Sequence, residues 1–252
     1  MPINYSRRLT GRVRSGKANR SLGFALAFIA GAINAGGFLA VHQYTSHMTG
    51  IVSSMADNVA LGTFDAALAG LGALLSFVIG AGCSSILVNF ARQRNMHSEF
   101  ALPLMVEAVL LLGFGLMGER LAMVDDGLFV SLTVMLLAFI MGLQNAVISK
   151  LSNAEIRTTH ITGIVTDIGI ELGKLAYRNC EGHTGLGRVV ANRPRLKLLS
   201  TLAGCFFIGG LAGALGFSHL GYLATVPLAL TLVALASVPV VDDVRARWRG
   251  TP

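Results

Sequence analysis

Six apolar runs, each close to the about 20 residues that cross a bilayer as a helix, constrain this chain most. Only 13% of its 252 residues are charged and 53% are hydrophobic, whereas soluble domains carry about 25% charged residues. We therefore expect an all-α integral membrane protein with six transmembrane helices in one domain, residues 22–240. The six runs cover residues 22–41, 66–90, 101–118, 128–148, 198–217 and 221–240.

The basic residues predict how the chain is oriented. With the N-terminus in the cytoplasm, every Lys and Arg except Arg120 falls on the cytoplasmic side, as the positive-inside rule requires. Both termini are then cytoplasmic, residues 1–21 as a basic disordered tail and residues 241–252 as a second basic tail. Because the basic residues flank apolar runs, the net charge of +7 indicates a partner in the lipid bilayer and not nucleic acid.

One short polar stretch occurs twice. Residues 45–54 read TSHMTGIVSS and residues 158–167 read TTHITGIVTD, with six of ten positions identical. Each copy follows the first of three apolar runs in its half, and an odd number of spans turns the second half upside down. We therefore expect two inverted three-helix repeats, 22–118 and 128–240, each with a broken or re-entrant Thr-Gly segment. A basic insertion at 177–197 reads as a cytoplasmic loop.

The repeated stretch is the candidate binding site. Thr49 and Thr162 stand where a short helix can begin, and a helix start offers free N–H groups to an anion or polar solute. The alternative is that Thr-Gly only lets two helices pack tightly. We expect the two copies to converge near the midplane. The candidate substrate-binding residues are Asn34, Thr45, His47, Thr49, Gly50, Asn145, Thr158, His160, Thr162 and Gly163.

Amides and ionisable side chains near the motifs have two interpretations each. Asn34 and Asn145 either contact substrate or support a helix break, which Gly36-Gly37 indicates in the first copy. The histidines are candidates for a proton relay. An acid inside the membrane is by default functional, and the alternative for those beside the motifs is a solvated face of an interfacial helix. The candidates for proton or ion coupling are Asp57, Glu107, Asp167 and Glu171.

Other chemistry is weakly represented. The three cysteines lack metal-ligand spacing, and His42 with His47 has no second pair to complete a metal site. No nucleophile motif or phosphate-binding glycine loop occurs, so we expect no enzyme activity, no metal and no cofactor. Gly209-x-x-x-Gly213 indicates close helix packing in the core, with a homodimer contact as the alternative.

The segments 44–50 (YTSHMTG), 142–146 (GLQNA) and 157–163 (RTTHITG) resemble the YoaK-like family, which is defined by a domain of unknown function. The resemblance covers about 22–240. It implies a multi-pass protein of the bacterial inner membrane with no settled activity. Ile51 stands where that family commonly has a polar residue, often Asn.

The sequence therefore favours a secondary transporter or channel-like protein for a small polar or anionic solute, with proton coupling as an option. The alternative is a membrane scaffold or sensor that binds a partner through the loop 177–197, and an intramembrane enzyme is the weakest candidate. Substrate, coupling ion, transport direction and oligomeric state are left open by the sequence.

Overall fold

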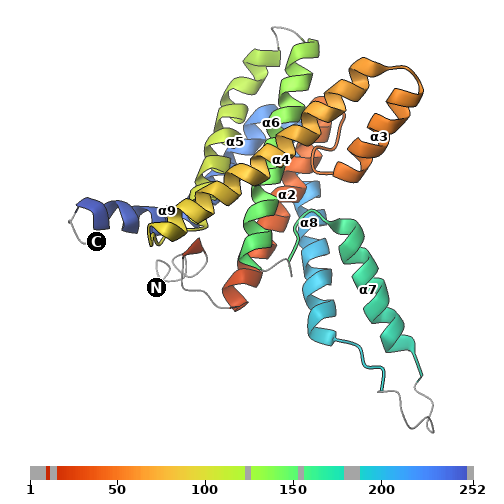
Figure 1. Ribbon diagram of the computed structural model, residues 1–252, viewed down its shortest axis with the longest axis vertical. Helices are drawn as coiled ribbons and strands as arrows, with labels where there is room; N and C mark the ends of the chain where they lie inside the picture. Colours follow the sequence, from red (N-terminus) through yellow and green to blue (C-terminus); the bar gives the residue numbers. More distant parts are fainter. Residues whose placement is uncertain (1–9, 12–15, 123–125, 153–155, 179–187, 249–252) are drawn as a thin grey trace.

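The computed structural model describes residues 10–11, 16–122, 126–152, 156–178 and 188–248. These residues form helices and connecting segments without a β-strand (Figure 1). The helices are α2 (Gly16–Val41), α3 (Met48–Ala60), α4 (Phe64–Gln93), α5 (Ala101–Ala122), α6 (Asp126–Leu151), α7 (Ile161–Ala176), α8 (Arg193–Leu220), the short 3₁₀ helix η1 (Gly221–Ala224) and α9 (Thr225–Trp248).

The described residues contain five helical stretches long and apolar enough to cross a membrane. The last of them, Arg193–Ala246, holds both α8 and α9. The chain turns between these two helices at Gly221, whose φ of 57° lies in the left-handed region that glycine tolerates. The chain is thus an all-helical, multi-pass membrane protein, as its apolar runs predict.

Some helices extend beyond the predicted runs. Because α2 begins at Gly16, residues 16–21 are helical and not part of a disordered tail. Helix α8 begins at Arg193 because the Asn192 side chain accepts a hydrogen bond from the Arg195 N–H at 3.0 Å, so 193–197 do not belong to the loop. Residues 1–9 and 12–15 of the predicted tail and 179–187 of the predicted loop lie outside the described residues.

Two pairs of helices pack with their backbones in close contact, α2 with α8 and α4 with α6. Each helix carries a Phe-x-x-Gly sequence, and the glycine faces the carbonyl oxygen of the partner helix's phenylalanine so closely that a Cβ would overlap it. Small residues allow such backbone contact between membrane helices. The reciprocal contacts join Gly31 to Phe206, Gly209 to Phe28, Gly80 to Phe139 and Gly142 to Phe77.

The directions of the helices follow from these contacts. Phe28 meets Gly209 and Gly36 meets Phe217, so α2 and α8 run parallel. Gly213 lies against Ala32, which confirms that the Gly209-x-x-x-Gly213 pattern packs in the core. Helices α4 and α6 are also parallel, because their contacts progress from Gly72 with Met135 to Asn89 with Lys150.

Helix α5 packs antiparallel to α9. At one end the Thr225 hydroxyl donates to the Leu111 carbonyl oxygen at 3.0 Å. At the other end Asp243 accepts hydrogen bonds from the backbone N–H groups of His97 and Ser98, each at 2.8 Å. The short helices α3 and α7 lie outside this bundle, α3 against α4 and α7 against α8, at opposite ends of the molecule (Figure 1).

Candidate functional site

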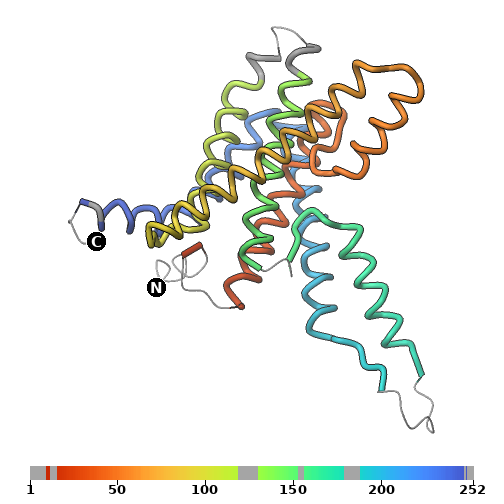
Figure 2. Tube along the Cα trace, in the orientation of Figure 1, coloured from red at the N-terminus to blue at the C-terminus, as the bar shows by residue number. Residues whose placement is uncertain are grey.

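Each copy of the repeated stretch folds back along the helix that precedes it. The Ser46 hydroxyl donates to Asn34 Oδ1 at 2.8 Å, and the Thr159 hydroxyl donates to Asn145 Oδ1 at 2.8 Å. Both asparagines lie about two turns before the last residue of their helix. The chain therefore leaves α2 and α6, reverses, and begins α3 and α7 beside those helices (Figure 2). This is a structural use of both asparagines.

The predicted break near Asn34 is absent. Helix α2 continues through Gly36 and Gly37 to Val41. A Cβ at Gly36 would meet the Phe217 ring, and one at Gly37 would meet the Leu137 side chain. The two glycines therefore serve close packing of α2 and do not interrupt it.

The short helices begin one residue earlier than the threonines suggest. Their N-caps are His47 and His160, and neither side chain makes a capping hydrogen bond. Thr49 and Thr162 lie within the first turn and are exposed. A Cβ at Gly50 or at Gly163 would collide with the preceding histidine ring. The threonines therefore follow the N-caps by two residues, and the first-turn N–H groups are left without a side-chain cap.

The first copy lines a pocket between α3 and α4 with a volume of about 460 Å³. His47, Gly50 and Ser54 of the motif segment face it, together with Tyr44 and Asn58. No Lys, Arg, Asp or Glu is among its described lining residues. This pocket is polar and uncharged apart from its two histidines, His42 and His47.

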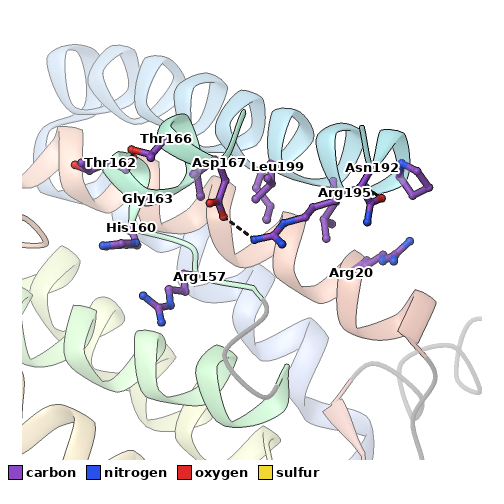
Figure 3. Close-up of a pocket in the computed structure, with 14 residues that line it drawn as sticks. Arg20, Arg157, His160, Thr162, Gly163, Thr166, Asp167, Asn192, Arg195 and Leu199 are labelled. Atoms are coloured by element: carbon purple, nitrogen blue, oxygen red, sulfur yellow. Dashed lines mark hydrogen bonds and ion pairs between the residues drawn. The ribbon is translucent and has the colours of Figure 1, made fainter. Parts of the chain in front are cut away.

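The second copy lines a larger pocket of about 700 Å³ between α7 and α8. Figure 3 shows its arginines on three elements: Arg20 on α2, Arg157 in the link before α7, and Arg195 on α8. Asp167 Oδ2 lies 2.9 Å from Arg195 Nη2 and forms an ion pair with it. The other motif residues that line this pocket are His160, Thr162, Gly163, Ile164 and Thr166.

The two pockets share no lining residue. The two copies thus line separate pockets, and their convergence near the midplane stays a prediction. Each short helix packs against the next long helix of its own half, α3 on α4 and α7 on α8. From their first turns the two short helices extend toward opposite ends of the molecule (Figure 1).

The remaining candidates have different environments. Thr45 and Thr158 are fully buried, and neither hydroxyl has a hydrogen-bond partner among the described residues. Asp57 is exposed on α3 and is not among the pocket's lining residues. Glu107 is fully buried in α5, and neither of its carboxyl oxygens has a partner in the described part of the chain.

Glu171 ties the end of α7 to the start of α8. Its carboxylate accepts hydrogen bonds from Lys174 Nζ at 2.7 Å and from the Asn192 N–H at 2.6 Å. The bond from Lys174, followed by that from Asn192, lowers the pKa of Glu171 below its ordinary value. In the first half the corresponding tie is neutral, because the Thr63 hydroxyl donates to Asn58 Oδ1 at 2.7 Å. Glu171 thus has a structural role.

The model of one protein family matches residues 22–238, which include every lining residue of the two pockets except Arg20. The family is described as a protein of unknown function, DUF1275. The chain belongs to the DUF1275 family. The YoaK-like resemblance of the motifs is consistent with this membership and is confirmed by it. No curated protein and no solved structure matches the chain.

Sequence reasoning missed several residues of the DUF1275 pockets. Arg20 and Arg195 lie far from the motif in sequence and reach it because α2 packs on α8, so no local signal marks them. Arg157 was visible, since it directly precedes the second copy. Among the described residues of this DUF1275 chain, no group of three His, Cys, Asp or Glu side chains is placed to hold a metal ion.

Proposed function

We propose that this protein is a transporter or channel-like protein for a small polar or anionic solute, and not an enzyme. The observation that carries the proposal is the correspondence between the two pockets. His47 and Gly50 line one pocket as His160 and Gly163 line the other, and each pocket stands at the uncapped start of a short helix. Such helix starts favour anions and polar groups, and paired sites in two halves are typical of transporters.

Two inverted repeats account for this correspondence. With the N-terminus in the cytoplasm, α2 and α8 run outward, while α4, α6 and α9 run inward. This agrees with the parallel pairs α2–α8 and α4–α6 and the antiparallel pair α5–α9. Counting α8 and α9 separately gives six crossings. The pocket beside α3 then opens to the outside and the pocket beside α7 to the cytoplasm of a bacterial cell.

Solute would pass between the pockets by alternating access, with α3 and α7 as the moving parts. Both are short and lie outside the close helix pairs α2–α8 and α4–α6, so they move at little cost to the core. Asp167 faces a pocket, and Glu107 is buried without a partner among the described residues, so these two acids are our candidates for coupling to protons or ions. Asp57 and Glu171 do not line either pocket.

The transport proposal is tested in two steps. Untargeted metabolomics of a deletion strain against a complemented strain identifies an accumulating or missing solute. Flux of that solute is then measured in proteoliposomes with the double variant His47→Ala/His160→Ala. We expect flux to fall at least tenfold, while the control Asp57→Asn retains it. Undiminished flux in the double variant overturns the assignment of the pockets, and absence of flux for every solute favours a scaffold.

The inverted arrangement is tested by thiol labelling in whole cells. Cys83, Cys180 and Cys205 are first replaced by Ser, and a cysteine is then introduced at Tyr44 or at the corresponding Arg157. We expect a membrane-impermeant thiol reagent to label Tyr44→Cys from outside, and Arg157→Cys only after the membrane is opened. Labelling of both positions from the same side contradicts the proposal.

A further inference from the structure

The charges of the pocket beside α7 are absent from its counterpart in the other half. Arg157 corresponds to Tyr44 by the spacing of the two motif copies. Arg195 corresponds to Ala66, which lines the pocket beside α3, when the Phe-x-x-Gly sequences of α8 and α4 are aligned. The fold-back link, the uncapped helix start and the packed long helix occur in both halves. Because the first half builds the same architecture without them, the arginines are not required for the fold of the pocket.

These arginines outnumber the acids around them. Asp167 is the one acid among the described residues that line the pocket, and it pairs with Arg195. Arg20 and Arg157 have no ion-pair partner in the described part of the chain. Guanidinium groups bind phosphate and carboxylate oxygens through paired N–H donors. The start of α7 adds N–H groups to which the His160 side chain offers no cap.

One of the three cations, Arg195, is already engaged in an ion pair with Asp167. This ion pair joins α7 to α8 across the pocket, and its partners are partly exposed, with 38% and 55% of their side chains accessible. An anion that enters the pocket competes with Asp167 for the Arg195 guanidinium. When Asp167 is displaced, one of the contacts that hold α7 on α8 is lost.

We propose that the pocket between α7 and α8 binds an oxyanion, a phosphate or carboxylate group, which Arg20 and Arg157 hold and for which Arg195 exchanges its bond to Asp167. The binding itself stands on the pocket. Its role in transport, and its position on the cytoplasmic side, rest on the proposed function. The oxyanion belongs either to a free solute or to the headgroup of an anionic lipid.

Binding is measured on the full chain in nanodiscs of phosphatidylcholine with radiolabelled inorganic phosphate. We expect saturable binding that weakens about tenfold or more in Arg157→Gln, because a charge-assisted contact is lost. In Asp167→Asn we expect affinity to rise about threefold or more, because the competing carboxylate is removed. Arg94→Gln, which removes a charge outside the pocket, is the control and leaves affinity unchanged. Arg157→Lys keeps the positive charge but lacks the paired N–H donors of the guanidinium group, so we expect an intermediate affinity. This variant replaces Arg157→Gln in the test if Arg157→Gln does not fold.

A second arm identifies the source of the oxyanion. Nanodiscs that also contain phosphatidylglycerol are examined by native mass spectrometry for lipid retained by the wild type, Arg157→Gln and Asp167→Asn. The pocket is assigned to a lipid headgroup if Asp167→Asn retains the most phosphatidylglycerol and Arg157→Gln the least, and if the bound lipid prevents inorganic phosphate from binding. Phosphate binding that the lipid does not reduce assigns it to a free solute. Both results support the oxyanion pocket.

The proposal is overturned if neither ligand binds in a manner that depends on Arg157, or if Asp167→Asn weakens binding. Flux separates this outcome from failure of the transport proposal. Transport of a neutral or cationic solute without Arg157-dependent anion binding overturns the oxyanion pocket and leaves transport intact. Arg157-dependent anion binding without flux of any solute overturns the transport proposal and leaves the oxyanion pocket intact.

Discussion

The Ser46 hydroxyl donates a hydrogen bond to Asn34 Oδ1 at 2.8 Å, and the Ser46 N–H donates to the same oxygen at 3.3 Å. One amide oxygen thereby fixes the point at which the chain, having left α2, runs back along it. This contact sets the starting depth of α3, and the corresponding pair of Thr159 with Asn145 sets that of α7.

Replacing Asn34 with Ala is expected to destabilise the fold by about 1–3 kcal/mol, because the partly buried Ser46 donors lose their acceptor. Thermal unfolding of the purified protein in detergent measures the change. Asn89→Ala is the matched control, since Asn89 is an exposed amide that accepts from Lys150. An equal, small effect of both variants means that the fold-back is held by other contacts.

The parallel helix pairs predict a strong position dependence for glycine substitutions in α4. Gly80→Ala is expected to cost about 1–3 kcal/mol, because the added methyl group overlaps the Phe139 carbonyl oxygen and forces α4 from α6. Gly82→Ala, two residues further in the same helix, has open space around its Cβ and is expected to be neutral or to gain up to about 1 kcal/mol. Unfolding by denaturing detergent compares the two, and equal stabilities contradict the close contact.

The parts of this structure that the sequence predicts depend on short stretches of sequence, and the parts that it does not predict depend on contacts between distant residues. An apolar run long enough to cross a bilayer is a local property, so the long helices were predicted closely. The position of α3 was not predicted. A short polar link has the same sequence character whether the next helix begins beyond the end of α2 or beside α2. The hydrogen bond to Asn34 decides between these, and it joins residues whose spacing carries no signal.

The candidate site divides in the same way. His47 and His160 were predicted to act together because their sequences match, yet each lines its own pocket. The charge of the second pocket depends on Arg20 and Arg195, which meet through the packing of α2 on α8. Residue pairs brought together by packing are invisible in a single sequence.

The buried hydroxyls of Thr45 and Thr158 either have no partner in the folded protein or bond to a water or ligand. These two cases give opposite expectations for the stability of variants without the hydroxyl. Because neither has a partner among the described residues, Thr45→Val and Thr158→Val are expected to keep the fold within about 0.5 kcal/mol of wild type or to stabilise it slightly. Thermal unfolding of each variant measures this. A loss of more than about 1 kcal/mol contradicts the expectation and indicates that the hydroxyls bond to a water or ligand in the folded protein.

The tie between Glu171 and the start of α8 is expected to weaken in acid. The folded protein holds the pKa of Glu171 below its ordinary value of about 4.5. A depressed carboxyl pKa contributes stability that is complete above the unfolded value and is lost as pH falls through the folded value. Spin labels on Leu175→Cys and Val189→Cys should therefore report a narrow distance distribution at pH 7 that broadens at pH below about 4.5.

The first half supplies the control for this pH effect. Its corresponding tie, from the Thr63 hydroxyl to Asn58, has no group that titrates in this range. Labels on Ala60→Cys and Phe64→Cys should show distances that do not change between pH 7 and 4. In a Glu171→Gln background, the distances at the end of α7 should also become independent of pH. Broadening that persists in this variant assigns the acid effect to another group.

Glu107 is the sharpest test of coupling. Its carboxyl group is fully buried and has no partner in the described part of the chain, and such burial is costly and calls for a function. Glu107→Gln keeps the volume of the side chain and adds no charge, so the fold is expected to persist, as size-exclusion chromatography and thermal unfolding show. If Glu107 carries the coupled proton, the variant loses accumulation driven by a pH gradient and retains exchange of solute down its own gradient, since an amide binds no proton near neutral pH. Asp57→Asn, an exposed acid outside both pockets, retains both activities. Accumulation that survives in Glu107→Gln excludes Glu107 as the proton carrier and leaves Asp167 as the candidate.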